Sequence, residues 1–509
     1  MLAKVKSSAL LGIDGYTVEV EADVSPALPS FDIVGLPDAA VKESKERIRS
    51  AIRNSTLTLP PRRIVVNLAP ADIKKAGSHY DLPIAAAVLF ASDQAEIKNA
   101  DEYVLIGELA LDGSLRAVRG VLPMVISAYQ SGIRKVVIPK ANAREAAVIE
   151  DMEVYGAENL LEAVRHLSGK APIERTRVSA KEIFETGAKC AYDFADVKGQ
   201  DEVKRALEIA AAGGHNVAMS GPPGSGKTML AKRVPGILPD MTFKEALEVT
   251  KIHSISGNLP EGASLITERP FRSPHHTVSA AGLSGGGTNP RPGEVSLSHG
   301  GVLFLDELPE FRRDALEILR QPLEDREITI TRSGGTYTYP CSFMLIASYN
   351  PCPCGYRGDP NHECSCSDSQ IVKYMSKISG PLLDRIDIRI DVRPVSFEDL
   401  KNKAPGEPSE KIRARVNRAR AIQLERYKDT QIVSNSALTE ELMEKYCVLD
   451  REGSELLKFA FTRLGLSARA YNRILKVART IADLDESEDI KAAHISEAIQ
   501  YKTAVNPGE

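Results

Sequence analysis

Long apolar runs are missing from this sequence of 509 residues. No stretch of about 20 consecutive apolar residues occurs, so a membrane-spanning helix is not expected. The N-terminal segment lacks a sustained apolar stretch and soon turns acidic, which argues against a secretory signal peptide. Internal repeats and low-complexity tracts are also absent from the sequence. We therefore expect a cytoplasmic protein without a membrane segment.

A strong excess of charge of either sign is lacking as well. The 65 Lys and Arg residues and 69 Asp and Glu residues leave a net charge of −4, which excludes a uniformly basic nucleic-acid-binding coat. Any contact with DNA must then use local basic patches. An apolar fraction of 43% and a charged fraction of 26% are typical of globular proteins, and a chain of this length buries an ample core without disulfides. Disordered, fibrous and disulfide-stapled classes are excluded.

Pattern and composition divide the chain into four segments. Residues 1–168 mix apolar strand patterns with helical stretches, and residues 169–189 form a polar linker. Residues 190–395 alternate apolar strands, Gly-rich loops and helices, which is typical of a parallel sheet covered by helices. Residues 396–509 begin with a Pro-rich, charged break and then show helical periodicity. The sequence therefore predicts a multidomain α/β protein.

The clearest chemical motif is a phosphate loop, G-x-x-x-x-G-K-[ST], which follows an apolar strand and opens a helix. It consists of Gly221, Pro222, Pro223, Gly224, Ser225, Gly226, Lys227 and Thr228. The glycines let backbone N–H groups turn toward a polyphosphate, and the helix N-terminus adds its dipole. Lys227 is expected at the β- and γ-phosphates of ATP, and the Thr228 hydroxyl is expected on Mg²⁺.

Two further apolar strands end in polar side chains that suit such a site. Residues 301–305 lead into Asp306, expected to hold Mg²⁺ through water, and Glu307, expected to orient the attacking water. Residues 343–347 lead to Asn350, which could sense the γ-phosphate or position the water. An Asn that precedes a proline also suits a simple turn, and that alternative stays open.

Four cysteines lie within fifteen residues, at Cys352, Cys354, Cys364 and Cys366, with His362 between the two pairs. Four thiols match the ligand number of a structural zinc site. The C-x-C pairs are tighter than the usual C-x₂-C spacing, so reduced free thiols or a redox pair are the alternatives.

The order of these motifs resembles an AAA+ ATPase. The sequence continues from the phosphate loop to FLDEL, the strand before Asn350 and SGPLLDRID. The segments RPFRSPHHTVSAAGLSGGG and FDIVGLPDAAVKESKERIRSAI are similar to the magnesium-chelatase-like AAA+ ATPases, in their ComM/YifB branch. The resemblance spans essentially the whole chain. It implies an S5/Lon-protease-like α+β domain at the N-terminus, an AAA+ core and a C-terminal helical lid.

The resemblance also implies a homo-oligomeric ring, usually a hexamer, in which neighbours complete each ATP site. Arg385 resembles the arginine finger that reaches a neighbour's γ-phosphate. Arg469 resembles the sensor-2 arginine of the lid, with Arg473 as the competing candidate. Residues 269–287 and the hairpin over 327–340 resemble elements that face the ring pore, and plain interface loops are the alternative.

From this resemblance we expect an ATP-driven motor on single-stranded or branched DNA, a branch-migration helicase in natural transformation. The basic segment 411–428 could contact DNA phosphates or form a solvated helix face. The segment GSHYDLPIAAA lacks the serine signature of Lon, so the N-terminal domain is expected to be non-proteolytic. A metallochelatase motor subunit and an ATP-binding scaffold are the alternative functions.

Overall fold

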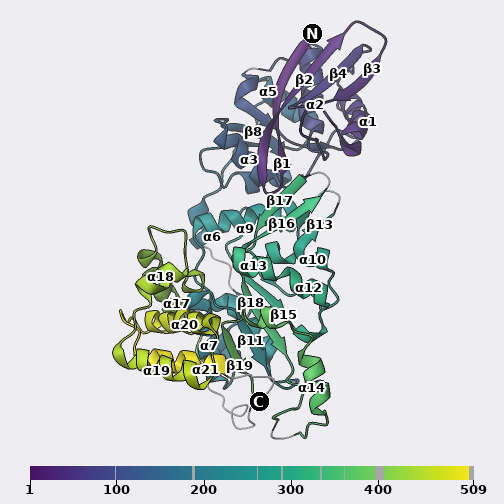
Figure 1. Cartoon of the computed structure of the whole chain (residues 1–509). Coiled ribbons are helices and arrows are strands. Elements are labelled where there is room, and N and C mark those ends of the chain that lie inside the picture. The colour runs from purple at the N-terminus through teal and green to yellow at the C-terminus, as the bar shows by residue number, and fades with distance from the viewer. Residues whose placement is uncertain are drawn as a thin grey trace. The chain divides into compact units, whose positions relative to one another are not determined.

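The structure is a computed structural model (Figure 1). It describes residues 1–97, 99–185, 190–260, 262–287, 290–332, 335–359, 362–395 and 406–503. The chain divides into two compact units, one of Met1–Gly187 with Phe243–Thr267 and one of Ala188–Thr242 with Glu268–Glu509. Residues 243–267 therefore belong to the N-terminal unit, although the chain on both sides of them belongs to the second.

In the first unit, the described residues form a mixed sheet of eight strands, in the order β10-β9-β8-β5-β1-β2-β4-β3. The strands are β1 (Leu2–Leu11), β2 (Asp14–Ser25), β3 (Ser30–Val34), β4 (Arg63–Ala69), β5 (Tyr103–Leu105), β8 (Lys135–Pro139), β9 (Glu153–Ala157) and β10 (Arg175–Thr176). Alternate residues of β2 are buried, as expected for a strand with one face on the core. The short strands β6 (Glu108–Leu109) and β7 (Leu115–Arg116) form a separate pair.

Helices complete this α+β unit. They are α1 (Ala39–Asn54), α2 (Asp81–Ala91), α3 (Val121–Gln130), α4 (Ala143–Ala146), α5 (Leu160–Leu167), α6 (Ala180–Glu185) and α9 (Phe243–Ser256). Every residue of α2 is buried, which explains why its sequence is apolar on all sides after Asp81. Helix α9 packs against α3, and Gly120 N donates to Ser254 O at 3.1 Å. The Ser254 hydroxyl also donates to the buried carboxylate of Glu145.

In the second unit, five strands of the described chain form a sheet in the order β12-β15-β18-β11-β19, and every pairing is parallel. They are β11 (Val217–Ser220), β12 (Phe271–Arg272), β15 (Val302–Leu305), β18 (Met344–Tyr349) and β19 (Ile388–Asp391). All residues of β11, β15 and β18 are buried, because helices cover both faces of a parallel sheet. The predicted parallel sheet is confirmed.

The helices of this core are mostly short. They are α7 (Asp201–Gly213), α8 (Lys227–Ala231), α10 (Ala280–Ser284), α11 (Glu294–Leu297), α12 (Arg313–Ile318), α13 (Arg320–Asp325), α14 (Asp368–Met375) and α15 (Gly380–Leu383). The strands β16 (Glu327–Arg332) and β17 (Gly335–Pro340) pair as an antiparallel hairpin, where the sequence predicts one. Residues 333–334 lie outside the described residues. A smaller pair joins β13 (Gly285–Gly286) to β14 (Arg291–Pro292).

The C-terminal part of the described chain is helical, as predicted. Its helices are α17 (Ser409–Arg426), α18 (Glu440–Tyr446), α19 (Arg451–Arg463), α20 (Ala468–Leu484) and α21 (Ala492–Thr503). Helices α17 and α20 pack on α7, and α21 packs on β19 (Figure 1). Apolar residues of these helices and of the sheet form one continuous cluster, so the lid shares a core with the ATPase sheet.

The basic residues of α17 are largely engaged within the second unit. Arg415 pairs with Glu208 and Glu407, and Arg426 pairs with Asp483. Arg413 pairs with Asp240 and Arg418 with Glu486, and Lys428, just after the helix, pairs with Glu425. Such internal pairing explains the basic character of this helix without a nucleic acid.

Among the described helices, none has both the length and the apolar character needed to cross a bilayer.

Candidate active site

The phosphate loop connects β11 to α8, as its sequence predicts. Gly224 and Gly226 have φ values of +79° and +94°, in the left-handed region that favours glycine. Gly221 has no room for a side chain, because a Cβ there would lie 2.3 Å from the carbonyl oxygen of Val392. These glycines permit the tight turn with which such loops direct backbone N–H groups at a polyphosphate.

The predicted metal-binding groups meet directly. Strands β11, β15 and β18 are parallel, so the residues that follow their carboxyl ends gather at one edge of the sheet. The Thr228 hydroxyl donates to Asp306 Oδ2 at 2.6 Å. A hydroxyl and a carboxylate at this separation offer the hard oxygen ligands that Mg²⁺ prefers, so these two residues could hold the ion beside a nucleotide.

Lys227 connects the loop to the strand that ends near Asn350. Its Nζ donates to Gly221 O at 2.7 Å, to Pro222 O at 2.9 Å and to Asn350 Oδ1 at 3.3 Å. Burial lowers the pKa of Lys227, while the carboxylates of Asp306 and Glu307 oppose that shift. The ammonium group thus lies in a partly desolvated site, where its attraction to phosphate oxygens is stronger than in water.

Ser348 is a site residue that the sequence analysis missed. This buried residue of β18 donates its hydroxyl hydrogen bond to Asp306 Oδ1. The bond orients the carboxylate whose other oxygen accepts from Thr228. A signal was present, because Ser348 is a small polar residue within a strand of mostly apolar residues that leads to Asn350.

Glu307 adopts a left-handed backbone conformation, with φ +55°. Non-glycine residues rarely occupy this region, and such residues concentrate at functional sites. Its Oε2 lies 3.7 Å from Nδ1 of His276, a residue that the sequence analysis did not single out. His276 follows β12, which runs parallel to β15, so the chain after both strands reaches the same edge of the sheet. Residues 269–287 thereby reach the predicted water-orienting carboxylate.

The predicted arginines lie at the other edge of the sheet. Asn216 precedes β11 and Arg385 precedes β19, and Asn216 Nδ2 donates to Arg385 O at 3.0 Å. The Arg385 guanidinium donates to Glu324. Arg469 is 76% exposed and lies 3.6 Å from Asp384. The structure therefore does not bring either arginine to the phosphate loop of its own chain.

A cavity of about 500 Å³ opens beside Arg385 and is rich in cations. Arg326, Arg473 and Lys476 also line it, and sequence reasoning missed Arg326 and Lys476. Burial opposes the ionisation of Asp387 in this cavity, but the imidazole of His215, whose Nδ1 lies 3.5 Å from Asp387 Oδ2, and the charge of Arg473 hold the pKa of Asp387 well below its usual range. Two carboxylates, Glu324 and Asp387, accompany four cations in this lining, and the excess of positive charge suits an anionic ligand.

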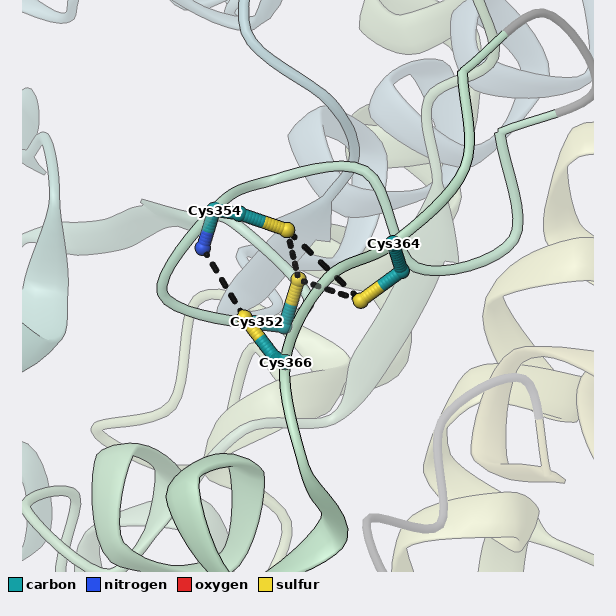
Figure 2. A group of neighbouring side chains, drawn as sticks. All are labelled: Cys352, Cys354, Cys364 and Cys366. Carbon is teal, nitrogen blue, oxygen red and sulfur yellow. Dashed lines mark hydrogen bonds between the residues drawn. The ribbon is translucent and has the colours of Figure 1, made fainter.

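The four predicted cysteines converge in the loop between β18 and α14 (Figure 2). Their sulfur atoms all lie within 4.8 Å of one another. Cys352 Sγ lies 3.4 Å from Cys354 Sγ and 3.6 Å from Cys364 Sγ, and Cys354 N donates to Cys366 Sγ at 3.4 Å. None of the seven cysteines, all of which lie in described parts of the chain, forms a disulfide. His362 points its Nδ1 at Asp359, 3.7 Å away, and is not one of the clustered groups.

Three segments of the chain match known families. They are residues 193–400 with "Magnesium chelatase, subunit ChlI", residues 20–142 with "Subunit ChlI of Mg-chelatase", and residues 406–502 with "Magnesium chelatase, subunit ChlI C-terminal". The central match contains the phosphate loop, Asp306, Glu307 and Arg385. The C-terminal match contains the lid helices with Arg469 and Arg473.

Two bacterial proteins are similar over nearly the full length. Competence protein ComM of Haemophilus influenzae is 44% identical over 508 residues, which cover 99% of this chain and 98% of the relative. YifB of Escherichia coli is 43% identical over 504 residues, which cover 98% and 97%. Lon protease 2 of Bacillus subtilis is 32% identical over 143 residues, or 26% of each chain. The chain therefore belongs to the magnesium-chelatase-like AAA+ ATPase family, in the branch of ComM and YifB.

Proposed function

We propose that this protein is a Mg²⁺-dependent ATPase that works as a ring-shaped motor on DNA, a branch-migration helicase of natural transformation and recombination. The observation that carries the ATPase part is the 2.6 Å hydrogen bond from Thr228 to Asp306, which joins the phosphate loop to the metal-binding strand. Similarity to a protein named for competence, over 99% of the chain, supports the role in transformation. The cytoplasm is the proposed compartment.

Proteins of this AAA+ family typically oligomerise, and the two edges of the sheet support a head-to-tail ring. The phosphate loop lies at one edge, and Arg385 lies at the other with the cation-lined cavity. Heterologous contacts that close by rotation form rings. In a proposed hexamer, the cavity of one subunit receives the phosphates of the neighbour's ATP. Arg385 is the proposed finger, and Arg469 or Arg473 provides the sensor-2 charge.

Two elements of the core are proposed to contact DNA in the ring pore. Residues 269–287 reach Glu307 through His276, which offers a route from DNA contact to hydrolysis. The β16–β17 hairpin carries a ladder of exposed threonines, in which Thr329 Oγ1 lies 3.1 Å from Thr338 Oγ1. Its exposed Arg332 supplies a cation for the phosphate backbone. Helix α17 is a weaker candidate, since most of its cations are paired internally.

A metallochelatase motor subunit is the second candidate, because the matching families are described as magnesium chelatase. In that case ATP hydrolysis would depend on a porphyrin-binding partner subunit and would not respond to DNA. An ATP-binding scaffold is the third candidate, in which a Glu307→Gln change would leave the protein's activity unaltered.

We also propose that the four clustered thiols hold a structural zinc ion. Four sulfurs at the Zn–S distance of about 2.3 Å in a tetrahedral site lie about 3.8 Å apart. The sulfur separations of 3.4 Å and 3.6 Å are close to that spacing before any ion draws the thiolates into place.

The test is ATP turnover with no DNA, with three-strand junctions and with four-strand junctions, each at 50 and 200 mM salt. The proposal expects junctions to stimulate turnover and expects the apparent affinity for DNA to fall steeply with salt, because phosphate contacts release counterions. Turnover that ignores every DNA would overturn the DNA motor, and an absence of turnover would overturn the ATPase.

A further inference from the structure

The cysteine loop directly contacts the phosphate loop. Gly355 follows Cys354 by one residue and has φ +89°. A Cβ at Gly355 would lie 2.7 Å from Cδ and 3.2 Å from Cγ of Pro223, the third residue of the phosphate-loop motif. The backbone at Gly355 therefore fits against the Pro223 ring with no space for a methyl group.

The same loop begins directly after β18. Asn350 directly follows β18 and lies two residues before Cys352, and its Oδ1 accepts from Lys227 Nζ at 3.3 Å. Cys352 is completely buried, and its carbonyl accepts from Gly355 N at 3.0 Å. Residues 350–355 thus contact two parts of the nucleotide site, the ammonium of Lys227 and the ring of Pro223.

The second cysteine pair closes this loop from ten or more residues away. Cys364 Sγ lies 3.6 Å from both Cys352 Sγ and Cys354 Sγ, and Cys366 Sγ accepts from Cys354 N (Figure 2). Thiol contacts of this kind are weak, whereas four metal–thiolate bonds contribute substantially to the folding of such loops. The geometry of residues 350–355 then depends on whether the thiols hold a metal.

We propose that zinc on the four thiols positions the phosphate loop, so that metal occupancy sets the rate of ATP turnover through Gly355 and Asn350. This inference rests on the proposed ATPase function and specifies a control of that same site. Gly355 and Asn350 here are positioning residues: the metal holds their segment, and the segment holds Pro223 and Lys227. Since small misplacements of catalytic groups reduce rates strongly, loss of the metal lowers turnover even though no thiol touches the nucleotide.

A pair of glycine variants separates loop contact from general strain. Gly355→Ala forces a methyl group against Pro223, whereas Gly358→Ala, at φ +79° in the same loop, meets nothing within 4 Å. Both substitutions impose similar backbone strain. The proposal expects Gly355→Ala to reduce kcat for ATP by about tenfold or more, with zinc content unchanged, and expects Gly358→Ala to stay within about twofold of wild type. Equal effects of the two variants would overturn the positioning role.

Metal content is measured separately from activity. Elemental analysis of the full-length protein is expected to find about one zinc per chain, and this zinc is lost in Cys364→Ser/Cys366→Ser but kept in Cys190→Ser, which lies outside the cluster. Chelation of wild-type protein should reduce turnover, and added Zn²⁺ should restore it. Chelated protein that keeps full turnover, or wild-type protein that turns over ATP without zinc, contradicts the inference. Zinc-loaded wild-type protein with no turnover contradicts the proposed ATPase instead.

Discussion

His276 Nδ1 lies 3.7 Å from Glu307 Oε2, so a histidine of the segment after β12 faces the carboxylate expected to orient the attacking water. The His276 ring also lies against two other rings, 4.0 Å from that of His275 and 6.4 Å from that of Phe311 between centroids. Aromatic neighbours on two sides fix the position of this imidazole. Glu307 itself is held in a left-handed conformation.

A His276→Ala variant should therefore alter ATP turnover more than ATP binding. Without the imidazole, Glu307 samples more orientations. The kcat is therefore expected to fall by about threefold to tenfold, while KM stays within about twofold of wild type. His276→Asn keeps a hydrogen-bonding group at this position and should recover part of the wild-type rate. Steady-state kinetics of both variants provide the measurement, and a change in KM with constant kcat would contradict the positioning of Glu307 by His276.

Glu307→Gln should abolish turnover while ATP still binds. The amide retains the size of the side chain but cannot accept a proton or polarise water as a carboxylate does, so kcat is expected to fall by about 100-fold or more. Glu310→Gln is the matched control, because the Glu310 side chain is also partly exposed and forms an ion pair with Lys377. Phosphate release and nucleotide binding are measured on the same preparations. Normal hydrolysis by Glu307→Gln would remove this residue from its assigned role.

Arg385→Ala should inactivate the protein, and mixing should partly restore activity. In a ring, subunits with Arg385→Ala keep an intact phosphate loop, and subunits with Lys227→Ala keep an intact arginine. An interface between subunits that combines the intact phosphate loop of one with the intact Arg385 of the other forms a complete site. Mixed rings should therefore regain a fraction of wild-type turnover. The measurement is ATPase activity across mixing ratios. If every ratio gives only the sum of the two inactive preparations, each site is built from a single subunit.

Arg47 should stabilise the N-terminal unit through a buried carboxylate. Arg47 Nε and Nη2 donate to Asp81 Oδ2 and Oδ1 at 2.7 and 2.9 Å, and the Asp81 side chain is completely buried. Arg47→Ala leaves that carboxylate without its partner, which costs about 3–5 kcal/mol. Arg49→Ala removes an exposed pair with Glu46 and a cation–π contact with Phe31, and should cost no more than about 1 kcal/mol. Hydrogen exchange of the β1 and β2 amides in the full-length protein measures both changes.

The loss of stability caused by Arg47→Ala should also depend on pH. Burial raises the pKa of Asp81 to about 6, although Arg47 opposes that shift. Removing Arg47 raises the pKa of Asp81 further above its unfolded value of about 3.9, so the native state of the variant binds a proton more readily than the unfolded state. The destabilisation by Arg47→Ala should therefore be smaller at pH 5 than at pH 8. A larger loss of amide protection at pH 5 would contradict this assignment.

Local patterns in the sequence predicted much of the fold and two residues that the structure brings together, Thr228 and Asp306. The phosphate loop follows one apolar strand, and Asp306 and Glu307 follow another. These strands are apolar because the parallel sheet buries both of its faces. Since the strands are parallel, the residues that follow them meet at one edge of the sheet. The cysteine spacing likewise placed four thiols near one another, because they lie within fifteen residues of the chain. Each of these features depends on residues that are close to one another in the sequence.

Contacts between distant segments could not be obtained in this way. Ser348 on Asp306, His276 beside Glu307 and the cation-lined cavity at Arg385 each join residues dozens of positions apart, and Gly355 against Pro223 joins residues more than a hundred positions apart. The return of residues 243–267 to the N-terminal unit is another such contact. Periodicity along a chain indicates which face of an element is buried, but the partner that covers it depends on strand order and on the packing of side chains in three dimensions.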